Sequence, residues 1–471
     1  MIKFILNEKE ISTDLPSGFL LLDFVRYQKQ LIGTKIGCRE GDCGACTVLV
    51  GDIVNGQLEY RSMTSCLLPL GNVQFKHVVT VEGTNLEKLN PIQQYMSDEG
   101  ATQCGFCTPG FIVSLSGFCL SSEPPTYENA IAAIDGNICR CTGYKSIERA
   151  TANVVKLMQQ KKEGENQIDF VTEHHILPAY FNEIKNRLEI LKNNISEVLP
   201  KSTHPKFLGG GTDLYVQQHD TMVHTDIDFL LDNSILKGVR VNGDICCIGS
   251  AATVTDILQS DIFQKYFPKI SQHIKLVSST PIRNMATIAG NFVNASPIGD
   301  LSIFFLALDA QLNITYGITK RKISLRKFYK GYKDLDKLSE EYIESIEFKL
   351  PTKNSFFNFE KVSKRTHLDI ASVNTACSLE INNGFIESAS LSAGGVGPVP
   401  MYLSNASSYL VGKELSAETF SSAIKIALEE ISPMSDTRGT KEYKTLLLQQ
   451  LIKAHFISLF PELNFEKLMI D

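Results

Sequence analysis

The chain has 471 residues, which is too long for one hydrophobic core, so we expect three or four domains. Its 43% hydrophobic and 21% charged residues are typical of a globular protein. A formal net charge of −6, with no Lys/Arg-dense stretch, argues against nucleic-acid or anionic-membrane partners. The N-terminus does not read as a signal peptide, and no segment has the roughly 18 apolar residues that span a bilayer. We therefore expect a cytoplasmic protein with small-molecule or protein partners.

The use of cysteine indicates metal or redox chemistry, because disulfides are rare in a reducing compartment. Eight of the twelve cysteines form two groups. The first cysteine group is Cys38, Cys43, Cys46 and Cys66, and the second cysteine group is Cys104, Cys107, Cys139 and Cys141. Free cysteine is among the most buried residue types, so we predict that the scattered remainder are buried, unreactive thiols. These are Cys119, Cys246, Cys247 and Cys377.

Residues 1–76 are predicted to form a small α+β domain that carries the first cysteine group. Apolar runs on either side of the polar turn Asn7-Glu8-Lys9 indicate a β-hairpin, and the cysteine loop lies between a helix and a strand. The expected elements are the hairpin over 2–6 and 10–15, a helix over 20–25, and strands over 47–50 and 58–61.

Residues 77–160 are predicted to form an all-α domain, with the second cysteine group at helix ends. Pro109 indicates a helix start, because the missing N–H of proline is no loss in the first turn. The polar, glycine-containing stretch at 161–169 is the expected linker. The expected helices are 92–96, 109–120, 127–134 and 146–160.

Strand and helix signals alternate beyond the linker, and Leu350-Pro351-Thr352 interrupts the pattern near residue 350. We therefore expect one domain over 170–350 and a C-terminal domain over 351–471. The expected elements of the former are strands at Phe207, 227–231 and 246–249 and a helix near 255. Those of the latter are strands at 375–381 and 385–391 and amphipathic helices at about 417–430 and 440–459.

The first cysteine group has the spacing of a plant-type [2Fe–2S] site. Four residues and then two residues separate its first three members, and the fourth lies twenty positions after the third. Gly37, Gly41 and Gly44 allow the loop to fold back sharply and leave room for backbone N–H groups near the sulfurs. A structural zinc site is the alternative, although zinc sites usually pair two C-x₂-C hairpins.

The second cysteine group, a C-x₂-C followed at a distance by C-x-C, is less specific when taken alone, since it also suits zinc. Its position beside a predicted [2Fe–2S] site favours a second redox centre. A second cluster lengthens an electron path, whereas zinc has no redox chemistry.

Two glycine-bearing segments are candidates for a cofactor site. The run at 209–213 follows a predicted strand, and its backbone N–H groups suit a pyrophosphate, although a plain turn explains it equally well. It is neither a Rossmann fingerprint nor a P-loop. In the second segment small residues permit close approach, Asn291 and Ser296 offer hydrogen bonds, and Asp300 is an acceptor. A polar loop between core strands is the alternative there.

Together these segments resemble the small subunit of two-component xanthine dehydrogenases, within the molybdenum hydroxylase family. The resemblance covers essentially the whole chain. Its most specific pieces are GCREGDCGACTV at 37–48, QCGFCTPG at 103–110, GNICRCTGY at 136–144, GGGTDL at 209–214, RNMATIAGN at 283–291 and SPIGDL at 296–301.

The resemblance implies a multidomain α+β fold. Its parts would be a β-grasp [2Fe–2S] ferredoxin-like domain, an all-α [2Fe–2S] domain, an α+β FAD-binding domain of the vanillyl-alcohol-oxidase type and a C-terminal α/β domain. In such enzymes electrons pass from a molybdenum centre through the helical-domain cluster and the ferredoxin-like cluster to FAD and then NAD. The second cysteine group would hold the cluster nearer molybdenum, and the first group the cluster nearer the flavin.

By the same resemblance, Lys361 would lie near the flavin, where a cation favours the anionic reduced form. A solvated basic strand edge is the alternative for this lysine. The chain departs from the family at Leu276-Val277-Ser278-Ser279, where relatives often carry an aromatic residue. The remaining implied FAD residues are Gly209, Gly210, Gly211, Thr212, Asp213, Gly290, Asn291, Ser296 and Asp300.

No stretch of the sequence resembles a molybdopterin-binding region, so we expect that cofactor on a separate large subunit, in a heterodimer or a dimer of heterodimers. The predicted function is the electron-transfer subunit of a xanthine dehydrogenase, which oxidises hypoxanthine and xanthine to urate with NAD as acceptor. One alternative is the same subunit of another molybdenum hydroxylase that acts on an aldehyde or N-heterocycle. The other is a zinc-stabilised scaffold without a redox role.

Overall fold

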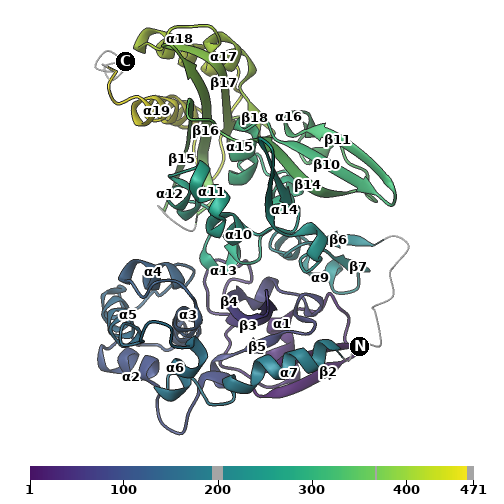
Figure 1. The fold of residues 1–471 in the computed structure, drawn as a ribbon, viewed down its shortest axis with the longest axis vertical. Coiled ribbons are helices and arrows are strands. Elements are labelled where there is room, and N and C mark those ends of the chain that lie inside the picture. Colours follow the sequence, from purple (N-terminus) through teal and green to yellow (C-terminus); the bar gives the residue numbers. More distant parts are fainter. Residues whose placement is uncertain (194–204, 366–368, 464–471) are drawn as a thin grey trace. The chain divides into compact units, whose positions relative to one another are not determined.

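The computed structural model describes residues 1–193, 205–365 and 369–463 (Figure 1). Its internal contacts divide the chain into two compact units. The first unit comprises Met1–Phe229 and the short segment Ser279–Ala286, and the second comprises Leu230–Ser278 and Thr287–Asp471. The prediction of a multidomain α+β fold is confirmed. The region predicted as the FAD-binding domain, 170–350, contributes residues to both units.

A five-stranded sheet in the order β2-β1-β5-β3-β4 begins the first unit. The pairing of β1 with β5 is parallel, and the other pairings are antiparallel. The sheet extends to Val79, beyond the predicted boundary at residue 76, because β5 fills the place between β1 and β3. The elements are β1 (Ile2–Leu6), β2 (Lys9–Thr13), α1 (Leu21–Asp23), the π-helix η1 (Phe24–Gln28), β3 (Thr47–Val54), β4 (Gln57–Thr64), the 3₁₀ helices η2 (Ser65–Leu67), η3 (Leu70–Val73) and η4 (Val81–Thr84), and β5 (His77–Val79).

Both faces of this sheet are covered, which explains the uninterrupted apolar run in β3. Side chains alternate between the faces of a strand. Val48 and Val50 join the core formed with α1 and η1, whereas Leu49 joins the core of the helical domain. A Cβ at Gly117 of α3 would lie 2.8 Å from Leu49 Cδ2, so this helix packs directly on the strand.

The helical part of the first unit is organised around α3, in which every residue from Gly110 to Leu120 is buried. Such a helix is central, since an apolar surface on all sides requires neighbours on all sides. The Asn166 side chain accepts from the N–H groups of Ile168 and Asp169, so a helix begins inside the stretch predicted as a linker. The helices are α2 (Pro91–Asp98), α3 (Thr108–Leu120), α4 (Tyr127–Ala133), α5 (Lys145–Met158), α6 (Gln167–Glu173) and α7 (Phe181–Asn193).

The first unit ends with a small parallel pair of strands and includes one helix from farther along the chain. The predicted strand at Phe207 is β6, and it pairs with β7. The elements are β6 (Lys206–Leu208), α8 (Leu214–Gln217), α9 (His219–Met222), β7 (Ile227–Phe229) and α13 (Thr280–Arg283). No described helix is both long and apolar enough to cross a membrane.

The second unit contains an antiparallel sheet in the order β11-β10-β14-β9-β8. Phenylalanine rings from α11, α15 and β14 pack against one another beside it, with Phe263 and Phe305 6.4 Å apart and Phe305 and Phe348 5.8 Å apart. The elements are η5 (Ser234–Leu236), β8 (Val239–Asn242), β9 (Ile245–Gly249), α10 (Val254–Gln259), α11 (Asp261–Tyr266), α12 (Ile270–Lys275), α14 (Ile288–Asn294), α15 (Asp300–Ala307), β10 (Gln311–Tyr316), β11 (Thr319–Ser324), α16 (Leu325–Phe328), β12 (Tyr329–Gly331), β13 (Asp334–Leu335) and β14 (Tyr342–Lys349).

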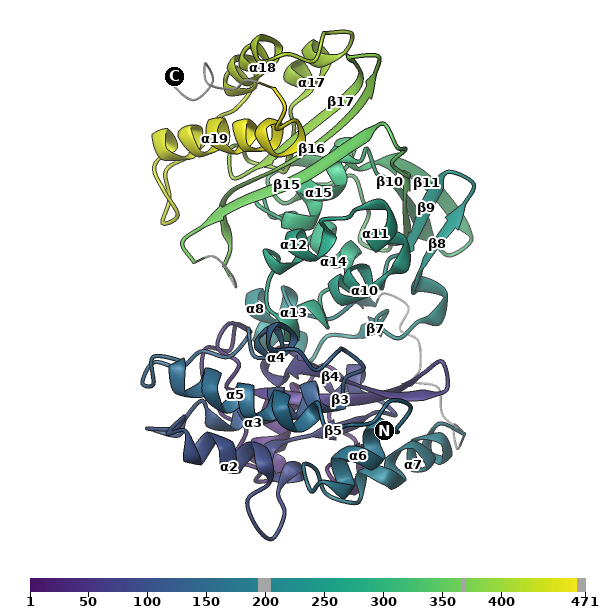
Figure 2. The same ribbon diagram turned by 60° about the vertical axis from the view of Figure 1, so that its left-hand side comes forward.

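A four-stranded antiparallel sheet in the order β15-β16-β17-β18 forms the C-terminal part of the second unit. Figure 2 shows α19 lying along one face of this sheet. Phe420 of α18 stacks on Phe456 of α19 with ring centroids 3.8 Å apart, which fixes the two helices together. The elements are β15 (Ser355–Ser363), β16 (Ala371–Asn382), β17 (Phe385–Gly394), β18 (Met401–Tyr402), α17 (Ser404–Leu410), α18 (Ala417–Glu429) and α19 (Lys441–Leu459).

A buried histidine pair joins this sheet to α12. Asn358 of β15 lies 3.0 Å from His455 Nδ1 and 3.2 Å from His273 Nε2, and His455 Nε2 lies 2.6 Å from the Thr375 hydroxyl. Burial lowers the pKa of His455 to about 3 and that of His273 to about 4. Both rings are therefore neutral at physiological pH.

We predict that the stability of the second unit falls as the pH decreases from 7 to 5. The folded pKa values of about 3 and about 4 lie below 6.5, so the unfolded chain binds protons that the folded chain does not. Each histidine then lowers the free energy of unfolding by up to about 2 kcal/mol at pH 5. Thermal unfolding midpoints measured across this range should depend less on pH in His455→Gln than in the wild type. The exposed His175→Gln variant is the control, and a His455→Gln profile equal to the wild type would contradict the prediction.

Candidate cofactor sites

The first cysteine group lies on two segments of the first unit. Three members precede β3 on one loop, and Cys66 lies in η2, directly after β4. The Cys38 N–H approaches Cys43 Sγ at 3.4 Å, and the thiols of Cys46 and Cys66 interact with each other. Contact with the Cys43 thiol and backbone N–H groups lowers the pKa of Cys38 to about 5. The structure thus brings together all four predicted residues.

Glycine is required in this loop for two separate reasons. Gly41 and Gly44 have φ of +81° and +67°, a conformation that side chains disfavour. A Cβ on Gly37 would lie 2.6 Å from Cys43 Sγ, so the sulfur occupies the space of the missing side chain. The Gly41 N–H also donates to Cys66 Sγ, which is the kind of hydrogen bond that tunes a bound cluster.

The second cysteine group lies on two loops of the helical part. Cys141 Sγ lies 3.5 Å from Cys104 Sγ, and the thiols of Cys107 and Cys139 interact. Cys139 Sγ accepts from the N–H and hydroxyl of Thr142 at 3.4 and 3.2 Å. Cys104 and Cys141 are exposed, whereas Cys139 is buried.

Both groups fit a dinuclear cluster. Within residues 1–193, 205–365 and 369–463, no three or more His, Cys, Asp or Glu side chains are placed to hold one metal ion. The eight thiols lie instead as four pairs, two in each group. Each iron of a [2Fe–2S] cluster takes two protein ligands, so two pairs supply one cluster.

The two cysteine groups are joined through their backbones. The Ile138 N–H, next to Cys139, donates to the Cys43 carbonyl at 3.0 Å, and Asn137 Nδ2 donates to the Gly44 carbonyl at 3.1 Å. The Ser114 hydroxyl of α3 holds the Asn137 amide at 2.8 Å. One hydrogen bond therefore links a predicted ligand of the first site to the residue beside a predicted ligand of the second.

The scattered cysteines play no part in either group. Cys119, Cys246 and Cys377 are buried, as predicted, whereas Cys247 is half-buried. Burial raises the pKa of Cys246 to about 12 and raises the pKa values of Cys119 and Cys377 further.

The glycine run 209–213 connects β6 to α8 in the first unit. A Cβ on Gly210 would lie 1.9 Å from the Met285 carbonyl oxygen, and Gly211 has φ +86°. Asn72 Nδ2 donates to the Gly209 carbonyl at 3.0 Å, so residues of the N-terminal domain pack against one side of the glycine run. Thr212 and Asp213 are half-buried at the start of α8.

The predicted FAD residues of the second unit cluster around α14 and α15. Gly290 is exposed, and a Cβ there would lie 2.8 Å from the hydroxyl of the helix cap Thr287, with open space on its other sides in the described part of the chain. Asn291 Oδ1 accepts from the N–H and hydroxyl of Ser302 at 3.0 and 3.1 Å. Ser296 lies in the turn before α15, where its hydroxyl accepts from the Ile298 N–H at 3.4 Å.

Lys361 and Asp300 form a buried ion pair. Lys361 Nζ lies 2.7 Å from Asp300 Oδ2, and the two side chains are 1% and 14% exposed. Lys361 also donates to the Leu276 carbonyl at 2.7 Å. The alternative of a solvated strand edge is therefore wrong for this lysine, whereas its role toward a flavin stays a prediction.

Asn374 belongs to the same cluster, and sequence reasoning missed it. It lies opposite Lys361 in the register of β15 and β16. Its Nδ2 donates to Asp300 Oδ1 at 2.6 Å and to the Ile298 carbonyl at 3.1 Å, while its buried Oδ1 has no hydrogen-bond partner among the described residues. No local signal marks it, because strand β16 contains several other polar residues and a second asparagine.

The predicted FAD residues form two separate sets. Gly209–Asp213 belong to the first unit, whereas Gly290, Asn291, Ser296, Asp300 and Lys361 belong to the second. The first set offers a close-packed glycine turn and the second an open helix start beside a fixed carboxylate and cation. Val277, in place of the family's aromatic residue, is buried.

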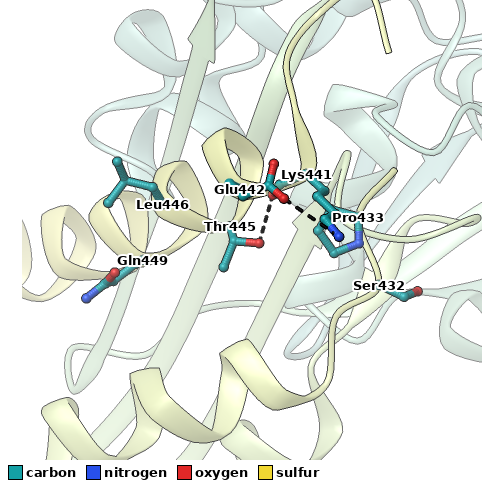
Figure 3. Close-up of a pocket in the computed structure, with 7 residues that line it drawn as sticks. All are labelled: Ser432, Pro433, Lys441, Glu442, Thr445, Leu446 and Gln449. Carbon is teal, nitrogen blue, oxygen red and sulfur yellow. Dashed lines mark hydrogen bonds and ion pairs between the residues drawn. The ribbon is translucent and has the colours of Figure 1, made fainter. Parts of the chain in front are cut away.

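A pocket of about 560 Å³ lies at the start of α19 in the second unit (Figure 3). Its lining includes Pro433, Leu446 and the adjacent Lys441–Glu442 pair, whose charged atoms are 3.7 Å apart. None of the predicted site residues lines it, so it adds nothing to the cofactor sites.

Four family models match successive parts of the chain. They are the 2Fe-2S iron-sulfur cluster binding domain at residues 4–70 and the [2Fe-2S] binding domain at 80–152. The FAD binding domain in molybdopterin dehydrogenase follows at 190–352, and the CO dehydrogenase flavoprotein C-terminal domain at 359–459. The chain thus contains two iron–sulfur domains and an FAD-binding domain.

Relatives and solved structures agree with this composition. Xanthine dehydrogenase of Emericella nidulans is 29% identical over 88% of this chain and 35% of its own length. Aldehyde oxidase 1 of Macaca fascicularis is 25% identical over 96% of this chain and 39% of its own. A crystal structure of Cu,Mo-CO dehydrogenase in its cyanide-inactivated form matches with a TM-score of 0.51 at 25% identity, covering 54% of this chain and 89% of that one.

These domains and their order match the iron–sulfur and flavin part of a molybdenum hydroxylase. The chain is similar to the corresponding parts of the proteins named above. It spans little more than a third of the length of the curated relatives it matches.

We predict that Gly44→Ala destabilises the first unit more than Gly56→Ala does. Both glycines have positive φ, which costs about 1–2 kcal/mol in a residue with a side chain. A Cβ on Gly44 would also lie 2.4 Å from the Gly136 carbonyl oxygen, whereas no atom of the described residues lies within 4 Å of one on Gly56. Thermal unfolding should show the larger loss in Gly44→Ala, together with reduced iron content. Equal losses in the two variants would contradict the close contact between Gly44 and Gly136.

We also predict that Lys361→Met lowers the free energy of unfolding by about 3–5 kcal/mol, because it leaves a buried carboxylate without its cation. The double variant Lys361→Met/Asp300→Leu should lose less than the sum of the two single variants. Chemical denaturation measures both effects. Lys364→Met is the control, since that lysine is exposed. Additive losses would show that the two charges are not coupled.

Proposed function

We propose that this chain is the electron-transfer subunit of a xanthine dehydrogenase, with one [2Fe–2S] cluster on each cysteine group and FAD on the residues described above. The observation that carries the proposal is the Ile138 to Cys43 hydrogen bond, which joins the two groups at 3.0 Å. Two redox sites in such contact suit a relay, whereas a carrier needs only one. Electrons would enter at the second cysteine group, pass to the first, and reach FAD and then NAD.

The surface around the second cysteine group supports entry from a partner. Cys104 and Cys141 are exposed, and Phe106 and Tyr144 beside them are 46% and 39% exposed. Exposed aromatic side chains next to a redox site suit a protein contact. The proposed partner is a molybdopterin-binding large subunit, in a heterodimer or a dimer of heterodimers. Its molybdenum centre would supply the two-electron oxidation of the substrate.

The first cysteine group suits a position farther along the relay. Cys46 and Cys66 are buried, and Cys38 and Cys43 are half-buried. On the flavin side, the Lys361–Asp300 pair would hold a positive charge in a dry site, which favours an anionic reduced flavin. Asn374 would keep the Asp300 carboxylate in place.

The proposed reaction adds an oxygen atom from water to a purine. Xanthine, water and NAD⁺ give urate, NADH and a proton, and hypoxanthine is first converted to xanthine in the same way. Two electrons leave the purine and two reach NAD⁺. The matches to xanthine dehydrogenases support this substrate.

The second candidate is the same role in another molybdenum hydroxylase, which the match to an aldehyde oxidase favours. The substrate pocket would lie on the partner in both cases. A zinc-stabilised scaffold has less support, because both cysteine groups fall within iron–sulfur family models and their thiols lie in pairs.

We predict that the native complex reduces NAD⁺ with xanthine and that its flavin and iron–sulfur absorption bleaches under anaerobic xanthine. Cys104→Ser should abolish NAD⁺ reduction because it interrupts the relay, whereas the buried Cys119→Ser should leave it intact. The measurement is NADH formation at 340 nm alongside the visible spectrum. Reduction with an aldehyde but not with xanthine would favour the second candidate. A colourless protein that contains zinc would overturn the relay itself.

A further inference from the structure

The segment Ser279–Ala286, here called the cover segment, packs against both cysteine groups within the first unit. It belongs to this unit although the chain on either side of it belongs to the second. It contains α13, and its side chains reach the loops of both groups. Nothing in the proposed function uses these residues.

Ile282 covers the loop of the first cysteine group. Its Cδ1 would lie 2.6 Å from a Cβ on Gly41, and Leu67 Cδ1 would lie 2.8 Å from the same position. Gly41 is also the residue whose N–H donates to Cys66 Sγ. Ile282 is half-buried against the core that contains Cys46 and Cys66. One apolar side chain therefore closes the space beside a hydrogen bond to a predicted ligand.

The cover segment is clamped by the loop that leads to the second cysteine group. Arg283 Nη2 lies 2.6 Å from Asp135 Oδ2, and the two side chains are 5% and 22% exposed. The Thr280 N–H donates to Asp135 Oδ1 at 2.7 Å. A Cβ on Gly136 would lie 2.8 Å from Pro281 Cδ, so the two loops are in direct contact.

The other end of the cover segment is fixed to the strand that leads to Cys66. Asn284 Nδ2 donates to the Ser62 carbonyl at 2.8 Å, and the Thr64 hydroxyl lies 3.6 Å from Met285 Sδ. Asn284 and Met285 are buried. Ile282 is thus held between two anchored ends.

We propose that the cover segment limits the access of water to the first cysteine group, and so sets the reduction potential of the cluster there. This inference rests on the proposed function. Ile282 is the shielding side chain, and Arg283 is a positioning residue that acts through it. Solvent exposure and hydrogen bonds to the sulfurs set the potential of an iron–sulfur cluster. Because reduction adds negative charge, water at this site stabilises the reduced form.

The test is a potentiometric titration, followed by electron paramagnetic resonance, of the full chain with its clusters. Ile282→Ala should make the potential of the first cluster less negative and leave that of the second unchanged. Ile282→Val should shift it by a smaller amount. The matched control is Ile318→Ala, since Ile318 is fully exposed on the turn between β10 and β11. The two signals are assigned with the Cys104→Ser variant.

Arg283→Ala should also make the potential of the first cluster less negative. Arg283→Lys, which keeps the cation, should shift this potential by a smaller amount. Arg240→Ala is the control, because Arg240 lies on the exposed strand β8. Release of iron to a chelator should be several-fold faster in Ile282→Ala and Arg283→Ala than in the wild type. If both clusters are present and Ile282→Ala leaves the potential of the first unchanged or more negative, the inference is overturned. If the wild type has no cluster signals, the proposed function fails instead.

Discussion

The close approach of two backbone loops is the constraint on which the first unit depends. Gly44 accepts a hydrogen bond from Asn137, and a Cβ on Gly110 at the start of α3 would lie 2.3 Å from the Gly44 carbonyl oxygen. No side chain fits at Gly44, and α3, the loop before Cys139 and the first cysteine loop meet there. Because both cysteine groups flank this junction, their separation is set by backbone atoms rather than by adaptable side chains. A relay needs such fixed spacing.

In the second unit, an ion pair rather than a glycine contact fixes the position of the groups. Lys361, Asp300 and Asn374 come from β15, α15 and β16, and their hydrogen bonds fix the carboxylate from two sides. A buried ion pair contributes little net stability on its own, since desolvation offsets the attraction. Together with Asn374, it holds the Asp300 carboxylate and the Lys361 cation at defined positions. The buried histidine pair ties α12, which leads into Leu276, to the same strand β15.

Much of the architecture could be predicted because its signals are local. Periodicity, proline and turn residues predict the hairpin, the helices of the helical part and the C-terminal strands. Cysteine spacing predicts both cysteine groups. The helix α6 was missed because the Asn166 cap lies in a polar stretch typical of a linker. Asn374 and the cover segment were missed because their partners are distant in sequence. Asn374 meets Asp300 seventy-four residues away, and Arg283 meets Asp135 at a separation of 148.

The proposed relay requires two [2Fe–2S] clusters side by side in this chain, one on each cysteine group. The most direct test is electron paramagnetic resonance of the fully reduced chain at low temperature, with chemical determination of iron and sulfide. We expect four irons and four sulfides per chain, because two clusters each hold two of both. We also expect two distinct signals, each split by magnetic interaction with the other. Half that iron content, or two signals without mutual splitting, would show that the two clusters do not lie together in this chain.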